Sequence, residues 1–288
     1  MAKKIVVFGA LGQLGVELCA ELTRRGYEVR GFERKALDIS NGEKVEQALA
    51  EFDPWAVFNA AAYNQVDVAE KEPLAAYEGN ALGVRNIALA CRHNDARLVH
   101  FSTDYVFDGK LGKPYVETDP THPLGAYAVS KLAGELYAQA YLERPIIVRT
   151  SGVFGPGGLR TARGNFPELM LRLAREGKPI RVVADHIASP TFAPALASRS
   201  IDVLERDLDG IFHIGGGRPI SWFDYAKLIF ATAGLSPDLT PTNEREYRTA
   251  ASRPKFSALE NARLRAHNIE PMPTLEDAIR QYFATRNP

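Results

Sequence analysis

Short apolar runs alternate with amphipathic stretches of helical periodicity along the first half of this chain. Runs of this kind occupy residues 4–9, 27–32, 56–61, 97–102 and 145–150. Continuous apolar runs are typical of strands buried on both faces, and strands that alternate with helices form βαβ units with right-handed crossovers. The alternation therefore predicts an α/β fold built on a doubly wound parallel sheet.

The pattern changes after Thr150. A loop rich in glycine and proline follows at residues 151–165, and short strands and proline-containing loops separate the later helical stretches. These helices still need an apolar surface to pack on, so the loop fits an active-site loop better than a linker. We expect a dinucleotide-binding domain at residues 1–150 and a smaller C-terminal region at 151–288, mainly substrate-binding and interleaved with the first.

Charge and composition exclude several classes of protein. The 288 residues contain 35 Lys plus Arg and 35 Asp plus Glu, and no basic run suggests a nucleic-acid partner. No stretch approaches the roughly 18 to 20 apolar residues that cross a bilayer, and the N-terminus lacks the apolar segment of a signal peptide. Cys19 and Cys91 both fall in helical patterns, which predicts core residues. We therefore expect a cytoplasmic protein without a catalytic metal or a membrane partner.

A glycine-rich turn, GALGQLG, joins the first predicted strand to the first predicted helix. Gly9, Gly12 and Gly15 have the spacing of the dinucleotide fingerprint, in which the backbone turns tightly and approaches a pyrophosphate. Amide groups where the helix begins, at Gln13 and Leu14, would hold the diphosphate. The turn predicts a Rossmann-type fold that binds NAD(P), with an ordinary strand-to-helix turn as the alternative.

The end of the second strand carries charges of both signs. Glu33 could accept hydrogen bonds from the adenosine ribose of NAD, whereas Arg34 and Lys35 could clamp the 2′-phosphate of NADP. We expect NADPH to be preferred and NADH tolerated; the alternative is that all three are solvated loop charges. Other residues expected to border the cofactor are Asp38, Ile39, Asn59, Ala60, Ala61 and Tyr63.

Tyr127 and Lys131 are four residues apart in GAYAVSKLAGE, so both side chains lie on one face of a helix. A nearby ammonium favours the phenolate and lowers the pKa of a phenol, which makes Tyr127 a usable acid near neutral pH. The hydroxyl of Thr103 could hold the carbonyl oxygen that is reduced. A lone Tyr-x-x-x-Lys is common on solvated helices, but next to the glycine turn these residues predict a hydride-transfer site.

These motifs resemble the extended short-chain dehydrogenase/reductase superfamily and, within it, the dTDP-4-dehydrorhamnose reductase family. The glycine turn and the Tyr/Lys pair are shared across the superfamily, whereas STDYVFDG and VDVAE are specific to this family. The resemblance runs nearly end to end and is carried by GALGQLG, NAAAYNQVDVAE, GNALGV, FSTDYVFDG, PLGAYAVSKLAGE, RTSGVFG, GNFPELMLRLA, DHIASPT, GIFHIGGG with SWFDYA, and SRPKFSAL.

The resemblance implies a reductase that delivers hydride from NADPH to the C4 ketone of a dTDP-linked 4-keto-6-deoxyhexose and forms dTDP-L-rhamnose. It implies that Thr103, Tyr127 and Lys131 form the catalytic set, in which Tyr127 protonates the alkoxide and Lys131 also holds the nicotinamide ribose. Asn80 would lie near the cofactor, although it could equally cap the next helix. The substrate residues that the resemblance implies are Asp104, Tyr105, Ser151, Gly152, Asn165, His186 and Arg253, the last as a holder of the diphosphate.

Three residues depart from the family pattern in segments expected to contact substrate. Gly152 stands where the family usually has tryptophan, which removes an aromatic wall from the expected sugar pocket. His186 replaces the usual glutamine and Phe256 the usual asparagine, and both changes alter the hydrogen bonds available. Trp222 begins an aromatic cluster with helical spacing, which predicts a core position or a subunit contact.

Other functions share much of this pattern. A reductase, epimerase or dehydratase for a different nucleotide sugar would fit the three departures, and epimerases and dehydratases show no net consumption of nicotinamide. A non-catalytic, cofactor-binding regulatory subunit has the same fold, but the intact set of Thr103, Tyr127 and Lys131 disfavours that function. A homodimer is compatible with the sequence.

Overall fold

A computed structural model of the protein describes residues 2–161 and 164–286. Within these residues the largest sheet has six strands, all parallel, in the order β2-β1-β3-β4-β5-β8. This confirms the predicted Rossmann-type doubly wound sheet. The strands are β1 (Lys4–Phe8), β2 (Glu28–Phe32), β3 (Ala56–Asn59), β4 (Arg97–Thr103), β5 (Ile146–Thr150) and β8 (Gly210–His213).

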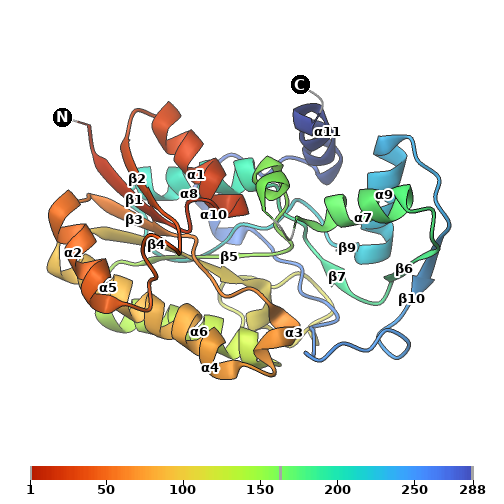
Figure 1. Ribbon diagram of the computed structural model, residues 1–288, viewed down its shortest axis with the longest axis horizontal. Coiled ribbons are helices and arrows are strands. Elements are labelled where there is room, and N and C mark those ends of the chain that lie inside the picture. Colours follow the sequence, from red (N-terminus) through yellow and green to blue (C-terminus); the bar gives the residue numbers. More distant parts are fainter. Residues whose placement is uncertain (1, 162–163, 287–288) are drawn as a thin grey trace.

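Helices cover both faces of this sheet (Figure 1). The helices α1 (Gln13–Arg24) and α8 (Ala193–Glu205) pack together on one face, and α2 (Gly42–Phe52), α5 (Gly83–His93) and α6 (Ala126–Tyr141) cover the other. Successive side chains of a strand point to opposite faces, so both faces of a central strand must be apolar. Strand β1 shows this, because Ile5 and Val7 belong to the apolar cluster on the α1/α8 face, while Val6 and Phe8 belong to the cluster on the opposite face.

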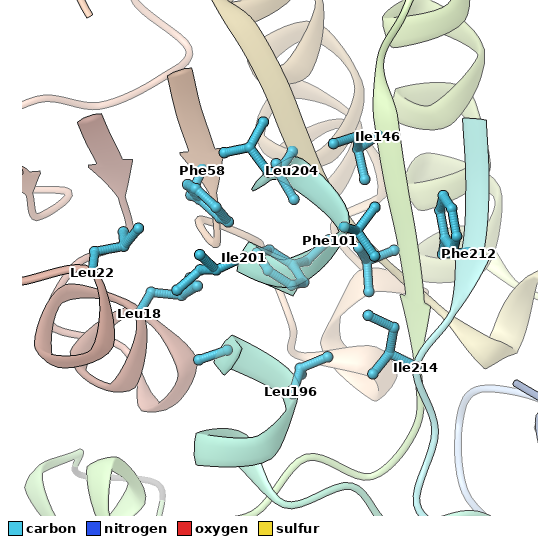
Figure 2. Packing of buried hydrophobic residues seen from close by; sticks show 14 of the residues in the cluster. Leu18, Leu22, Phe58, Phe101, Ile146, Leu196, Ile201, Leu204, Phe212 and Ile214 are labelled. Carbon is cyan, nitrogen blue, oxygen red and sulfur yellow. The ribbon is translucent and has the colours of Figure 1, made fainter. Parts of the chain in front are cut away.

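The α1/α8 cluster illustrates how distant segments build one core (Figure 2). Leu18 of α1 and Ile201 of α8 pack over Phe58 and Phe101 of the central strands. All four side chains are at most 6% exposed. The apolar face of α8, a helix from the second half of the chain, therefore completes the core of the first half.

The C-terminal region adds a third apolar cluster, around Phe154, Tyr225 and Tyr282. Its helices and strands are α7 (Phe166–Arg175), α9 (Trp222–Ala233), α11 (Leu275–Arg286), β6 (Ile180–Val183) paired with β10 (Leu239–Thr242), and β7 (Ile187–Ala188) paired with β9 (Ile220–Ser221). Strand β8 nevertheless belongs to the main sheet. The two-part division of the chain near residue 150 stays a prediction.

Shorter elements connect these layers: α3 (Val66–Ala69), α4 (Pro73–Tyr77), the π-helical turn η1 (Glu78–Leu82), the 3₁₀ turns η2 (Asp104–Val106) and η3 (Pro156–Arg160), and α10 (Ala262–Ala266). Asn80 lies inside η1, and the N-cap of α5 is Leu82, so the alternative in which Asn80 caps that helix is wrong.

Two expectations about burial had different outcomes. Strand β2 lies at the sheet edge and is partly exposed along its length, so the prediction that each run is buried on both faces is wrong for β2. Both cysteines are unpaired. Cys91 is buried in the cluster between the sheet and the helices α2, α5 and α6, and Cys19 packs, half-buried, against the α1/α8 cluster.

Candidate active site

The glycine-rich turn lies at the carboxyl end of β1, where the backbone passes close to the loop after β3. Gly9 has a φ of 75°, and a Cβ there would lie 2.7 Å from the amide nitrogen of Ala61. A Cβ at Gly15 would overlap the carbonyl oxygen of Gly9. Helix α1 begins directly after Gly12, and its first amide groups have no partner within the helix. The turn is therefore a cradle that fits a diphosphate.

A cavity of about 700 Å³ extends from this turn across the carboxyl ends of the strands. Ligands of open parallel sheets bind at this edge. The predicted site residues that line the cavity are Gly9, Gly12, Gln13, Leu14, Glu33, Arg34, Asp38, Ile39, Ala60, Ala61, Tyr63, Thr103, Asp104, Tyr127, Lys131, Gly152 and Asn165.

The end of the cavity next to β2 carries the mixed charges expected from the sequence. Arg34 is 82% exposed, and its Nε donates to Asp38 Oδ2 at 3.0 Å. The other oxygen of Asp38 accepts hydrogen bonds from the backbone and the hydroxyl of Ser40. Glu33 also lines this end, whereas Lys35 is not among the described lining residues. A guanidinium at the mouth of the cavity is well placed to meet a 2′-phosphate.

The three residues predicted to be catalytic line one cavity although they come from two elements. Thr103 ends β4, while Tyr127 and Lys131 lie one turn apart on α6. The Nζ of Lys131 donates to the carbonyl oxygen of Phe101 at 2.6 Å, which fixes the ammonium beside the end of β4. Burial lowers the pKa of Lys131 to about 8, although Glu135 opposes the shift.

Next to Thr103, the buried carboxylate of Asp104 accepts hydrogen bonds from three hydroxyl groups. Thr103 donates to Asp104 Oδ1 at 3.2 Å, while Ser151 and Ser257 donate to Oδ2 at 2.8 and 2.5 Å. Burial raises the pKa of Asp104 to about 6 even though these hydrogen bonds favour the carboxylate. The cluster orients the hydroxyl of Thr103 and joins segments from three parts of the chain.

A second cluster ties the cofactor turn to the C-terminal region. The Nε2 of Gln13 donates to the carbonyl oxygen of Val153 at 2.7 Å, and Gln13 Oε1 accepts a hydrogen bond from Asn165 Nδ2 at 3.0 Å. Asn165 also caps α7, because its Oδ1 accepts a hydrogen bond from the amide of Glu168. The two sides of the cavity are thereby joined through two amide side chains.

Three predicted cofactor residues, Gly15, Asn59 and Asn80, are not among the lining residues that the structure describes. Gly15 is buried in α1, next to Gly9 and Ala10 of the turn. Asn59 is fully buried, where its side chain contacts His100 Nδ1 and accepts from the Ala61 amide. Asn80 bonds both the N–H and the C=O of Tyr63. These residues shape the cavity wall from behind, and direct contact with a cofactor stays a prediction for them.

Four predicted substrate residues also lie outside the cavity lining as described. Ser151 is buried against Asp104. The ring of Tyr105 packs edge to face on Tyr127, with 6.1 Å between centroids. His186 is 7% exposed, and its carbonyl oxygen accepts from the amide of Trp222. Arg253 is the fourth.

The guanidinium of Arg253 is engaged by a carboxylate instead of facing the cavity. Its Nη1 and Nη2 donate to the two oxygens of Asp67 at 3.1 and 2.6 Å. Asp67 belongs to the VDVAE segment, which lies 186 residues earlier in the chain. Asp67 thus neutralises the guanidinium in this structure, and the expectation that Arg253 holds a diphosphate stays a prediction.

The expected gap beside Gly152 is partly closed. Gly152 has a φ of 50°, and a Cβ there would lie 3.2 Å from Cη2 of Trp222. Trp222 packs, partly buried, against the C-terminal cluster, which agrees with the predicted core position, but together with Phe166 it also lines the cavity, which the sequence did not predict. The other lining residues that sequence reasoning did not assign to the site include Leu11, Leu37, Ser40, Asn64, Ala75, Glu78, Gly79, Phe101, Ser102, Thr150, Val153 and Gly164. Most belong to loops flanking recognised motifs, so extending each motif by a few residues would have found them.

No group of three or more His, Cys, Asp or Glu side chains within residues 2–161 and 164–286 is arranged to hold a metal ion. Among the same residues no helix is long and apolar enough to cross a membrane.

Known proteins with similar sequences and structures match this chain over almost its whole length. Residues 3–287 match the family described as RmlD substrate binding domain. The spore coat polysaccharide biosynthesis protein SpsK of Bacillus subtilis is 37% identical over 99% of this chain and 98% of that protein. The dTDP-4-dehydrorhamnose reductase of Aggregatibacter actinomycetemcomitans is 38% identical, and the match covers 93% of this chain and 94% of that protein.

A crystal structure of dTDP-4-dehydrorhamnose reductase from Bacillus anthracis, solved in complex with NADP, superimposes with a TM-score of 0.94. That protein is 37% identical, and the match covers 99% of this chain and 100% of that one. The extent of these matches agrees with the glycine turn, the cavity and the Thr103, Tyr127 and Lys131 set. The chain belongs to the RmlD substrate binding domain family, together with the dTDP-4-dehydrorhamnose reductases.

Proposed function

We propose that this protein reduces the C4 ketone of a dTDP-linked 4-keto-6-deoxyhexose with NADPH and forms dTDP-L-rhamnose. As a member of this family the chain is an NAD(P)H-dependent oxidoreductase. The observation that carries the proposal is that Thr103, Tyr127 and Lys131 line the same cavity as the glycine cradle. A dinucleotide whose diphosphate lies in the cradle would extend along this cavity toward the three side chains.

Bound there, NADPH supplies the hydride that adds to C4 of the sugar. The hydroxyl of Thr103 has one proton, which it donates to Asp104 in this structure; it would turn this proton to the ketone oxygen as negative charge develops there. Tyr127 gives its phenolic proton to that oxygen, so the ketone becomes an alcohol. The buried ammonium of Lys131 stabilises the resulting phenolate and holds the nicotinamide ribose.

The charges next to β2 support NADPH over NADH. Arg34 is largely exposed at the mouth of the cavity, and its pairing with Asp38 leaves other guanidinium nitrogens to meet a phosphate. Glu33 lines the same end and would accept hydrogen bonds from an unphosphorylated ribose, so NADH is tolerated.

The test is a coupled assay that follows loss of nicotinamide absorbance with purified protein. The panel contains dTDP-, GDP- and UDP-linked 4-keto sugars, each with NADPH and with NADH. We expect turnover with a dTDP-4-keto-6-deoxyhexose and a preference for NADPH. No oxidation of NADPH with any dTDP-linked 4-keto sugar contradicts the proposal, and a product that is inverted or dehydrated with recycled cofactor indicates an epimerase or dehydratase.

A pair of tyrosine variants on α6 separates catalysis from a regulatory role. Tyr127→Phe removes the proton donor and should lower kcat by about 10²- to 10⁴-fold. Tyr137→Phe is the matched control, because Tyr137 lies on the same helix and its ring stacks on Tyr141 away from the cavity. Equal activity of the two variants, or an unimpaired biological role in Tyr127→Phe, contradicts a catalytic function.

A further inference from the structure

Two aromatic side chains of the C-terminal region form part of the cavity wall at its catalytic end. Trp222 is the first residue of α9 and Phe166 the first of α7, and these two helices pack together (Figure 1). Both side chains line the cavity beside Gly152. Gly152 follows Thr150, which is the register partner of Thr103 across β4 and β5. Trp222 and Phe166 therefore lie at the end of the cavity that holds Thr103, and not at the charged end next to Arg34.

The packing of these rings fixes their positions. The ring of Phe166 stacks on Tyr225 with 5.2 Å between centroids, and Trp222 packs edge to face on Phe166 at 4.7 Å. Ser221 caps α9 by accepting a hydrogen bond from the Asp224 amide, and the amide of Trp222 itself donates to the carbonyl oxygen of His186. The indole is thus held by its backbone and by its neighbours, which favours a preorganised binding surface.

Gly152 and Trp222 are sterically complementary. A Cβ at position 152 would lie 3.2 Å from Cη2 of Trp222 and 3.4 Å from Cα of Pro190, so the edge of the indole takes space that a side chain at 152 would need. The φ of 50° at Gly152 also disfavours a larger residue. The glycine allows the indole to approach the cavity floor next to Thr150.

We propose that Trp222, supported by Phe166, forms the wall against which the hexose ring of the substrate packs, and that this contact determines which sugar is accepted. The inference rests on the proposed function for the identity of the sugar. A pyranose presents a face of C–H groups, and a rigid aromatic surface binds such a face by excluding water and by dispersion contacts. The cavity would thus separate recognition of the sugar, by the C-terminal region, from recognition of the dinucleotide, by the glycine turn.

The first experiment compares two leucine variants of neighbouring aromatic residues in α9. We expect Trp222→Leu to raise KM for the nucleotide sugar by roughly 10- to 100-fold, as loss of an apolar pocket contact does, without changing the Kd of NADPH. Phe223→Leu is the control, because Phe223 packs in the C-terminal cluster and is not among the described lining residues. Trp222→Phe should recover most of the affinity. A KM for Trp222→Leu within two-fold of the wild-type value, or an equal loss of NADPH affinity, overturns the proposal.

The second experiment observes the indole directly and does not depend on turnover. The chain has two tryptophans. Trp55 stacks on Tyr27 and lies just before β3, at the amino ends of the strands, whereas the cavity lies at their carboxyl ends. In a Trp55→Phe variant saturated with NADP⁺, the fluorescence of Trp222 should change on addition of dTDP-L-rhamnose and much less with dTDP alone. An equal response to both ligands places Trp222 beside the nucleotide and overturns the proposal.

The two proposals fail in distinguishable ways. If the protein oxidises no NADPH with dTDP-linked 4-keto sugars, the proposed function is wrong, and the Trp222 titration is repeated with dTDP-glucose, UDP-glucose and GDP-mannose. A response to any of these, absent with the free nucleotide, supports the sugar-binding wall. No response to any nucleotide sugar overturns it, whatever the outcome of the activity assay.

Discussion

Burial of Lys131 should make this protein less stable than its packing allows, and removing the charge should reverse this. The side chain is 2% exposed, and burial lowers its pKa from the ordinary value of 10.5 to about 8. That fall means that the charged form costs the folded state about 3 kcal/mol more than the unfolded state. Lys131→Met removes this cost but leaves the carbonyl oxygen of Phe101 without its ammonium donor, a loss of about 1 kcal/mol. We expect the inactive variant to be about 2 kcal/mol more stable at pH 7.

The same shift predicts a pH dependence with a definite sign. Between pH 8 and 10.5 the unfolded chain keeps a proton on Lys131 that the folded chain has lost, so the free energy of unfolding rises with pH across this window. This contribution is fully present above pH 10.5 and is lost as the pH falls through about 8. The stability advantage of Lys131→Met over wild type should therefore fall as the pH rises, and above pH 10.5 the variant should be less stable by about 1 kcal/mol, because only the lost hydrogen bond then remains.

Urea unfolding of cofactor-free protein at a series of pH values from neutral to alkaline measures both effects. Lys178→Met is the matched control, because the side chain of Lys178 is 74% exposed to solvent. The reasoning about Lys131 is refuted if Lys131→Met is destabilised by about 2 kcal/mol or more at pH 7, or if its difference from wild type does not change with pH.

Three further outcomes follow from the cavity. Gly15→Ala should abolish measurable NADPH binding in a fluorescence titration, because the new methyl group overlaps the carbonyl oxygen of Gly9; retention of wild-type affinity would show that the turn can relax. Arg34→Ala should raise the Kd of NADPH roughly ten-fold and leave that of NADH unchanged, and an equal effect on both would contradict a role in binding the 2′-phosphate. Burial raises the pKa of the Asp104 carboxyl from 3.8 to about 6, so this group stabilises the folded state by about 3 kcal/mol below pH 3.8 and the contribution is lost as the pH rises through 6. Asp104→Asn should remove this pH dependence of the free energy of unfolding. Unfolding curves of wild type and Asp104→Asn that stay parallel from pH 4 to 7 would contradict this.

Local patterns predicted the parallel sheet and the shared helix face of Tyr127 and Lys131, because both depend on short stretches of the sequence. The strands β1 and β5 could be predicted from continuous apolar runs, which are typical of strands buried on both faces, and the shared helix face of Tyr127 and Lys131 from the pitch of a helix. The glycine turn was predictable for the same reason, since its spacing follows from the geometry of one strand-to-helix connection.

Contacts between distant segments were not predictable in this way. From the sequence, Arg253 was expected to have a free guanidinium in a loop between prolines. The fold instead brings this guanidinium to Asp67, whose carboxylate neutralises its charge. The aromatic spacing at the start of α9 is the same whether Trp222 faces the core or a cavity, and only the packing of α9 beside α7 decides the outcome. Asp104 similarly receives two of its three hydroxyl hydrogen bonds from serines 47 and 153 residues away.

The central claim, that hydride reaches a sugar ketone beside Tyr127, is tested most directly by isotope transfer. The purified enzyme is given dTDP-4-dehydrorhamnose and NADPH deuterated at both C4 positions of the nicotinamide, and the sugar product is analysed by NMR. We predict deuterium at C4 of the product with the wild-type enzyme and a rate of transfer at least about 100-fold lower with Tyr127→Phe. Oxidation of NADPH without deuterium at C4 of the sugar, or undiminished transfer in Tyr127→Phe, would contradict the account.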